Sequence, residues 1–428
     1  MKKITLYILL AALFGCVGSR QDSTTSTSDE FVRVEDGVFM LGDSVYRYIG
    51  TNFWYGPILA SEGRGGDRQR LAKELDALQE NGITNLRILV GAEGDEDMPT
   101  HIKPILQPKP GVYNDTLLDG LDYLMAELEK RDMKAVLYLN NAWQWSGGYG
   151  TYLEWAGEDK APDPNTEDYN DYVKHVAKFV VNDSAKKFAA DHARYMVSRT
   201  NRYTNKPYAE SPAIMSWQIC NEPRAFARDS VTKAAFAEWI ASQAALIKSL
   251  DPNHLVSTGS EGKYGCEVDI ELWKNIHSDD NIDYGLIHLW PFNWQWVNKT
   301  NLVDGIDTAF QKSYDYILPH RQLMNEIGKP LVLEEFGYPR DEYLFTPGSP
   351  TAGRDKFYDY VFSLFIDQNM FDGCNFWGWA GYAEPSGEQW ELGADYTCDP
   401  AHEPQGMYSV FAKDSTTINV IKDAVNKL

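Results

Sequence analysis

The 428-residue chain has few cysteines, and their spacing does not suit a metal site. It has five, none in a Cys-x-x-Cys pair, so neither a zinc site nor a dense disulfide framework is indicated. Cys220 and Cys374 fall in strand-like runs, where cysteine serves as a small apolar residue. The glycine-rich sequence of nucleotide-binding folds is also missing after the first predicted strand. We therefore expect neither a metal nor a cofactor, and the disulfide state stays open.

Basic residues are few as well, 40 against 62 acidic residues, for a net charge of -22. Such a charge repels phosphates and excludes a nucleic-acid partner, whereas it suits a soluble protein with a neutral substrate. Aromatic residues are abundant at 13%, including 13 Trp and 25 Tyr. Their flat apolar faces and polar edges suit stacking against sugar rings, although a large core would also use them.

The apolar run at residues 4–14 is too short to span a bilayer. Two lysines precede it and Gly-Cys follows it, which is the layout of a secretory signal. The end of this segment resembles a bacterial lipobox, in which Cys16 becomes the lipidated first residue. We expect a lipoprotein signal peptide at 1–16, a flexible polar tether at 17–30, and an exported protein held at the cell envelope through Cys16. The alternative is an ordinary signal peptide and a secreted protein.

From about residue 31 onward no linker or repeat divides the chain, and apolar runs alternate with amphipathic helical patterns. Near-continuous apolar runs are typical of parallel strands buried on both faces. Eight strands alternating with helices predict a (β/α)8 TIM barrel, α/β in class, as one monomeric domain over 31–428; a doubly wound sheet is the competing fold. The eight runs cover residues 46–54, 84–90, 134–140, 213–221, 254–260, 284–290, 329–337 and 373–381.

Polar residues stand where the fourth and seventh runs end, which is where barrel enzymes carry their active groups. Asn221 and Glu222 follow the fourth run, and Glu334 and Glu335 belong to the seventh. Two carboxyl groups from different strands are the working parts of a glycosidase: one protonates the leaving oxygen and the other attacks the anomeric carbon. We expect Glu222 to be the protonated one and Asn221 to hold the sugar 2-hydroxyl. Adjacent strand residues face opposite ways, so spacing leaves open which of the Glu334–Glu335 pair points inward and which faces a helix.

Two short motifs and their context resemble glycoside hydrolase family 5. The motifs are Asn-Glu-Pro at 221–223 and Glu-Phe-Gly at 335–337. The resemblance implies that Glu222 is the acid/base and Glu335 the nucleophile of a retaining mechanism, with the carboxyl groups roughly 5–5.5 Å apart. Further segments look like the β-mannanase branch of the family, in matching order: 50–56, 139–157, 212–224 and 287–296.

The same resemblance implies supporting roles for other residues. Arg87 would orient the nucleophile, His288 would support the acid/base and the sugar, and Trp377 would form the floor beneath the cleaved sugar. Trp290 departs from the tyrosine that many members carry there, and an indole donates a hydrogen bond but accepts none. The other predicted substrate contacts are Asn141 and, as sugar platforms, Trp54, Trp143, Trp145 and Trp294.

The resemblance therefore implies an enzyme that cleaves β-1,4 linkages in mannan, galactomannan or glucomannan, with cleavage inside the chain favoured. Release of short products from a chain end is an alternative, and the segments 140–183 and 338–352 could close the cleft for it. A β-1,4-glucanase of the same family is a second alternative. A glycan-binding lipoprotein without activity is disfavoured, because Glu222 and Glu335 are both present.

Overall fold

Eight parallel strands form the centre of the computed structural model, which describes residues 30–98 and 100–428. Their hydrogen-bonded order is β8-β7-β6-β5-β4-β11-β10-β9, so each strand lies beside its neighbour in sequence and only β8 and β9 remain unpaired with each other. This is the predicted (β/α)8 barrel, and every barrel strand falls within one of the predicted runs. The strands are β4 (Tyr48–Asn52), β5 (Asn85–Leu89), β6 (Lys134–Tyr138), β7 (Ile214–Gln218), β8 (Leu255–Ser257), β9 (Gly285–Leu289), β10 (Leu331–Phe336) and β11 (Gly373–Phe376).

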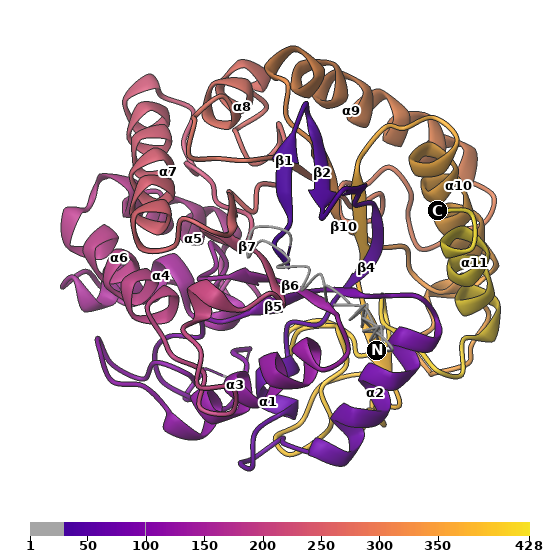
Figure 1. Ribbon diagram of the computed structural model, residues 1–428, viewed down its shortest axis with the longest axis horizontal. Coiled ribbons are helices and arrows are strands. Elements are labelled where there is room, and N and C mark those ends of the chain that lie inside the picture. The colour runs from indigo at the N-terminus through magenta and orange to yellow at the C-terminus, as the bar shows by residue number, and fades with distance from the viewer. Residues whose placement is uncertain (1–29, 99) are drawn as a thin grey trace, which may run out of the picture.

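Helices surround the strands in a ring (Figure 1). Their ends follow local rules: the Asp67 side chain caps the start of α2, and Gly328 ends α9 in the left-handed conformation. The helices are α1 (Gly56–Leu59), α2 (Arg68–Glu80), α3 (Asp115–Glu129), α4 (Gly148–Trp155), α5 (Tyr169–Val176), α6 (Asp183–Val197), α7 (Ser230–Leu250), α8 (Ile270–His277), α9 (Ile306–Ile327), α10 (Ala352–Ile366) and α11 (Ser415–Val425).

A small antiparallel sheet closes the end of the barrel where the strands begin. It consists of β1 (Arg33–Glu35), β2 (Val38–Leu41) and β3 (Ser44–Val45). Val32 and Phe39 form a buried apolar cluster with residues at or near the starts of barrel strands, among them Tyr48 and Leu255. Figure 1 looks onto this sheet, so the carboxyl ends of the strands, and the loops that follow them, lie at the opposite end.

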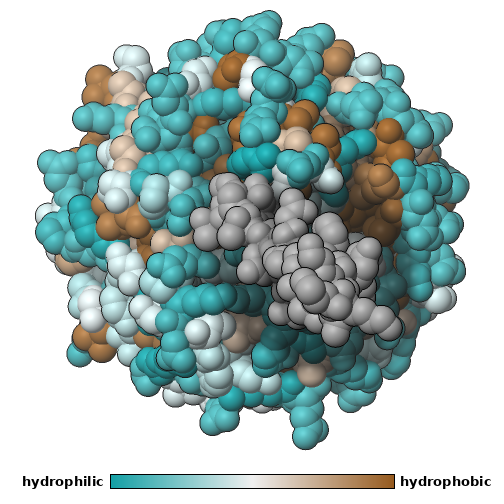
Figure 2. Space-filling view, in the orientation of Figure 1, coloured by the Kyte–Doolittle hydropathy of each residue, from teal (hydrophilic) through white to brown (hydrophobic). Residues whose placement is uncertain are grey.

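Outside the barrel, β12 (Trp379–Gly381) and β13 (Val410–Phe411) pair with each other and mark the two ends of a long loop after β11. On the face shown in Figure 2, hydrophilic residues predominate and hydrophobic ones are scattered. No helix among residues 30–98 and 100–428 is long and apolar enough to cross a bilayer. Cys220, Cys266, Cys374 and Cys398 are all buried and unpaired. The predicted signal peptide, Cys16 and the tether as far as residue 29 lie outside the described residues.

Candidate active site

A cavity of about 410 Å³ lies at the carboxyl ends of the barrel strands. Asn221, Glu222 and Glu335 all line it, so the structure brings together groups that the sequence separates by more than a hundred residues. Most of the predicted aromatic platforms line it too, together with one that the sequence did not suggest. These aromatic residues are Trp143, Trp145, Tyr169, Trp290, Trp294 and Trp377.

The backbone around Glu222 is held in an unusual conformation. Glu222 has a φ of 47°, in the left-handed region that non-glycine residues seldom adopt, and its N–H donates to the carbonyl of Gly259 across 2.9 Å. Gly259 itself has a φ of 80°, and a Cβ there would lie 1.7 Å from the carbonyl oxygen of Cys220. Only glycine permits this close approach of the loops after β7 and β8. The approach fixes the carboxyl group of Glu222 at the mouth of the barrel.

Arg87, on β5, holds the predicted nucleophile. It is fully buried, and its Nη1 donates to Oε1 of Glu335. Its Nη2 donates to Oδ1 of Asn221 at 2.9 Å, and its Nε donates to Oε1 of Gln218 at 3.0 Å. These partners engage its donors, and Arg87 does not line the cavity. Its place is therefore beneath Glu335 and Asn221 rather than against a substrate.

His288, on β9, bridges the two predicted catalytic carboxyl groups. Its Nδ1 lies 2.8 Å from Oε1 of Glu222 and 3.2 Å from Oε2 of Glu335. Burial acts to lower the pKa of His288, but the charge of Glu335 and hydrogen bonds to the surrounding glutamates raise it well above 6.5. Burial acts to raise the pKa of Glu222, but the hydrogen bond and charge of His288, with Arg224 and Trp143, lower it below its ordinary value.

These opposite directions favour His288 over Glu222 as the place of the shared proton in the free protein. They run opposite to the expectation that Glu222 is the protonated group of the resting site. That expectation considered the apolar strand before Glu222 but not a cation from another strand, which outweighs the effect of burial.

Glu222, His288 and Glu335 each present a potential metal-ligand atom, and these atoms lie within 4.8 Å of one another. The chemistry of the set does not favour a metal ion. Arg87 already neutralises Glu335, and the imidazole nitrogen that a metal would need is engaged with both carboxylates. The trio is better suited to moving a proton than to holding a cation.

Trp377 and Trp290 meet at an angle in the cavity. Their ring centroids are 5.8 Å apart with the planes 74° to each other, and Tyr408 packs edgewise on Trp290 at 4.9 Å. The indole nitrogen of Trp377 is buried and has no hydrogen-bond partner among the described residues. The two indoles offer an apolar floor and wall for a sugar ring.

Two predicted substrate contacts are wrong, because other residues cover them. Trp54 is only 1% exposed, donates its indole N–H to the Cys398 carbonyl and packs against Trp145, so it belongs to the core. Asn141 is fully buried and accepts a hydrogen bond from Nδ2 of Asn221 across 3.1 Å. It supports Asn221 from behind and does not line the cavity.

Glu334 also corrects a prediction, since it does not face outward toward a helix. The register of β10 against β9 pairs Leu333 with Ile287 and Glu335 with His288, which leaves Glu334 as an extra residue. This β-bulge breaks the alternation of strand side chains. Glu334 lies 3.3 Å from Arg87 and 3.8 Å from His288, inside the barrel.

Several lining residues were not anticipated from the sequence. Glu261 follows β8 and pairs with Arg224, two residues after Glu222; the rule that singled out Glu222 at its strand end would have found both. Burial raises the pKa of Glu261 to about 8, although the charge of Arg224 opposes this. His402 and Glu403 reach the cavity from the long loop after β11, where neither a strand end nor a motif predicts a site residue.

Of the two segments predicted to close the cleft, 140–183 contributes residues to the cavity lining, whereas 338–352 does not.

Comparison with protein families gives one match over almost the whole chain. A model described as GH family 5 beta-mannosidase-like matches residues 29–428. Among curated relatives, mannan endo-1,4-beta-mannosidase 1 of Arabidopsis thaliana is 27% identical, over 96% of this chain and 92% of its own. Putative mannan endo-1,4-beta-mannosidase 9 of Oryza sativa subsp. japonica is 28% identical over 81% of each chain.

Solved structures include a glycoside hydrolase family 5 mannosidase from Rhizomucor miehei. It is 34% identical and superposes with a TM-score of 0.85, covering 94% of this chain and 98% of its own. The hyperthermostable endo-1,4-beta-D-mannanase from Thermotoga petrophila is 25% identical, with a TM-score of 0.68 over 90% and 100% of the two chains.

Proposed function

The chain belongs to glycoside hydrolase family 5, and we propose that it hydrolyses β-1,4-mannosidic linkages with retention of anomeric configuration. The observation that carries this proposal is the arrangement of Glu222 and Glu335 about His288. One carboxylate oxygen of each lies within 4.8 Å of the other. This spacing is shorter than the roughly 6.5–9.5 Å between the carboxyl groups of inverting enzymes, and it supports the predicted separation of roughly 5–5.5 Å.

In the first step the carboxylate of Glu335, which accepts a hydrogen bond from Arg87, attacks the anomeric carbon while the bond to the leaving oxygen breaks. Glu222 gives a proton to that oxygen and receives one from Nδ1 of His288. The charge of Glu335 is the strongest of the effects that raise the pKa of His288. Forming the glycosyl ester removes this charge, so His288 releases its proton when Glu222 needs one.

In the second step Glu222 acts as a base. It takes a proton from water, the resulting hydroxide equivalent attacks the same anomeric carbon, and Glu335 departs as a carboxylate. The returning charge of Glu335 draws the proton back from Glu222 to His288. Two inversions at one carbon give net retention.

A mannan substrate is supported by the relatives and by the aromatic lining of the cavity. The curated relatives are mannan endo-1,4-beta-mannosidases, and the most similar structure reported above is a mannosidase. Trp377 and Trp290 supply the apolar surfaces that a pyranose ring stacks against. A β-1,4-glucan differs only at the 2-hydroxyl and remains the alternative to test.

For the position of cleavage, we propose cleavage within the chain, as the names of the curated relatives suggest. One observation favours a second candidate, cleavage at a chain end. Asn293, His402 and Glu403 line the catalytic cavity on one side and a neighbouring open groove on the other. They therefore lie where the two meet, and we propose that these three residues form a ridge that interrupts the continuous groove an endo-acting enzyme needs.

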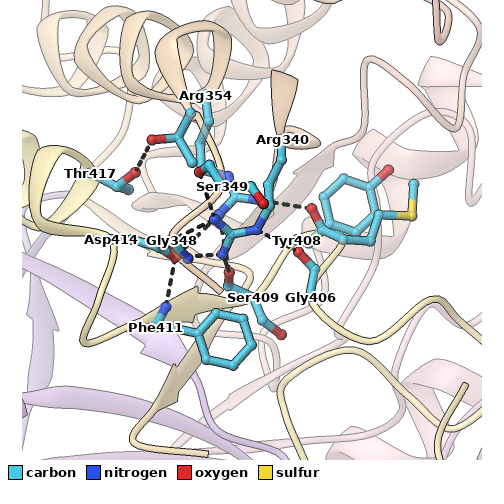
Figure 3. Close-up of polar contacts among 12 residues, drawn as sticks. Arg340, Gly348, Ser349, Arg354, Gly406, Tyr408, Ser409, Phe411, Asp414 and Thr417 are labelled. Carbon is cyan, nitrogen blue, oxygen red and sulfur yellow. Dashed lines mark hydrogen bonds and ion pairs between the residues drawn. The ribbon is translucent and has the colours of Figure 1, made fainter. Parts of the chain in front are cut away.

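Two of the three ridge residues, His402 and Glu403, belong to a firmly held loop between β12 and β13. Arg340 donates to the carbonyls of Gly406 and Ser409 and pairs with Asp414, while Arg354 donates to the carbonyls of Met407 and Ser409 (Figure 3). Both guanidinium groups are fully buried. Such contacts favour a preformed wall over a mobile lid, since moving the loop would leave buried charges without partners.

We also propose, from the sequence alone, that the protein is exported and anchored through lipidated Cys16. Metabolic labelling with a palmitate analogue tests this, with Cys16→Ala as the control. Incorporation into wild type and none into the variant would support the anchor. Equal incorporation into both would exclude it.

The product profile on linear mannan, galactomannan, glucomannan and cellulose tests the activity, with Glu335→Ala as the control. Early mixed mannooligosaccharides from mannan would support cleavage within the chain, and a single short product would support cleavage at the end. The variant Glu403→Ala lowers the ridge and should then broaden the range of products. Cleavage of cellulose alone, or of no polysaccharide, would contradict the mannan proposal.

A further inference from the structure

A third carboxylate lies beneath the proposed catalytic pair. Glu334 is 1% exposed, and its Oε2 lies 3.3 Å from Nε of Arg87 and 3.8 Å from Nε2 of His288. Its Oε1 accepts a hydrogen bond from Gln218, whose own carbonyl oxygen accepts from Arg87. Glu334 thus contacts the two cationic side chains that also hold Glu222 and Glu335.

The two nitrogens of His288 face different carboxylates. Nδ1 faces Glu222 and Glu335, whereas Nε2 has no hydrogen bond among the described residues and points toward Glu334. A neutral imidazole that donates from Nδ1 carries no proton on Nε2. Only the imidazolium has an N–H at both positions. A negative charge beside Nε2 therefore favours the charged ring over the neutral one.

We propose that Glu334 is a positioning residue, which keeps the proton on the Glu222–His288 pair by placing a negative charge at the second nitrogen of His288. Glu334 does not line the cavity, so it acts through His288 and Arg87 rather than on the substrate. This inference rests on the proposed function, to which it adds a third carboxylate. The bulge in β10 is what turns two consecutive glutamates into the same site.

Other ionisable groups surround this cluster. Wild type and Glu334→Gln carry the same set of them. Burial raises the pKa values of the surrounding tyrosines above 10, so they remain neutral in the working range. Burial raises the pKa of Glu261 to about 8, and its effect on His288 is common to wild type and variant. The groups facing Glu334 or His288 are Arg87 on β5, Glu222 after β7, Glu261 after β8, Glu335 on β10, and the tyrosines Tyr48, Tyr138 and Tyr284.

The test compares wild type with Glu334→Gln, which removes the charge and nearly keeps the shape. The first measurement is the pH dependence of kcat/KM for mannotriose, whose alkaline limb reports loss of the shared proton. The second is an NMR titration of His288 in the free enzyme with ¹⁵N-labelled histidine, assigned with His288→Gln. We expect both to shift toward acid by about one to three pH units in Glu334→Gln. In Glu334→Asp the side chain is one methylene shorter, so the carboxylate lies farther from His288. Both titrations should shift in the same direction but by less.

Asp122→Asn is the matched control, because Asp122 is equally buried and paired with an arginine, Arg199, but lies on α3. It should lose stability without moving either titration. If Glu334→Gln does not fold, the same two measurements on Glu334→Asp test the inference. An alkaline limb and a His288 titration unchanged in the folded variants would overturn the inference. The NMR measurement needs no substrate, so it separates failure of this inference from failure of the proposed activity.

Discussion

The indole N–H of Trp143 donates to Oε2 of Glu222 across 2.5 Å. The sequence had suggested Trp143 only as a sugar platform, and its position in the cavity is compatible with that role too. The hydrogen bond makes Trp143 part of the charge balance of the site, because it stabilises the ionised form of Glu222.

Replacing Trp143 with Phe should therefore strengthen proton binding by the Glu222–His288 pair. A hydrogen bond to a charged group contributes about 1.5–3 kcal/mol, which corresponds to a shift of about one to two pH units. We expect the alkaline limb of kcat/KM to move to higher pH, opposite to the shift expected for Glu334→Gln. Trp145→Phe is the control, since Trp145 lines the same cavity and, among the described residues, the indole hydrogen bond to Glu222 comes from Trp143. A limb that moves equally in both variants, or in neither, would contradict this role.

Glu335→Ala should lose turnover by at least about a thousandfold while still binding mannooligosaccharides. With an aryl β-mannoside and azide, the anion can enter the space left by the carboxylate and give the α-mannosyl azide. Glu222→Ala keeps the nucleophile, so azide should instead intercept the glycosyl-enzyme and give the β-anomer. Product NMR distinguishes the two anomers. The same anomer from both variants would refute the assignment of roles.

Stability should depend on pH through Glu93, a fully buried carboxyl group that accepts from the Tyr152 hydroxyl and the Gly148 N–H. Burial raises the pKa of Glu93 from 4.5 to about 8. Between these values the native state binds one more proton than the unfolded chain, so the free energy of unfolding falls as pH rises. The slope from this residue is about 1.4 kcal/mol per pH unit.

Urea unfolding at several values between pH 5 and pH 8 measures this slope. Glu93→Gln should have a shallower pH dependence than wild type, because its amide does not titrate. Glu154→Gln, at an exposed position on α4, the helix that carries Tyr152, should follow wild type. Parallel curves for wild type and Glu93→Gln would show that Glu93 is not the group responsible.

Arg340→Met should destabilise the protein by about 3 kcal/mol, because it leaves Asp414 buried without its closest partner. Denaturant unfolding measures the loss. Adding Asp414→Leu removes the stranded charge and should recover much of it. An additive loss in the double variant would show that the two residues act independently, and that the pair does not anchor the ridge loop.

Much of this protein follows from local patterns. Apolar runs of seven to nine residues alternating with helical periods predict the barrel, since strands buried on both faces carry such runs. A barrel places the ends of its strands at one mouth, which brings Glu222 and Glu335 together without any knowledge of contacts. Family motifs then select Glu335 and add Arg87 and His288, all of which the structure places around the carboxylates.

The sequence by itself therefore determined the barrel and the pair of carboxyl groups, because both depend on residue types at regular positions. Only the tertiary structure decided which groups meet and which are covered. Trp54 and Trp145 are both tryptophans after barrel strands, yet neighbouring loops bury the first and leave the second at the cavity. A bulge in β10 turns Glu334 inward, and His288 on another strand lowers the pKa of Glu222, which the sequence had predicted to be protonated. Burial, register and through-space charge arise between segments far apart in the chain, and no local pattern encodes them.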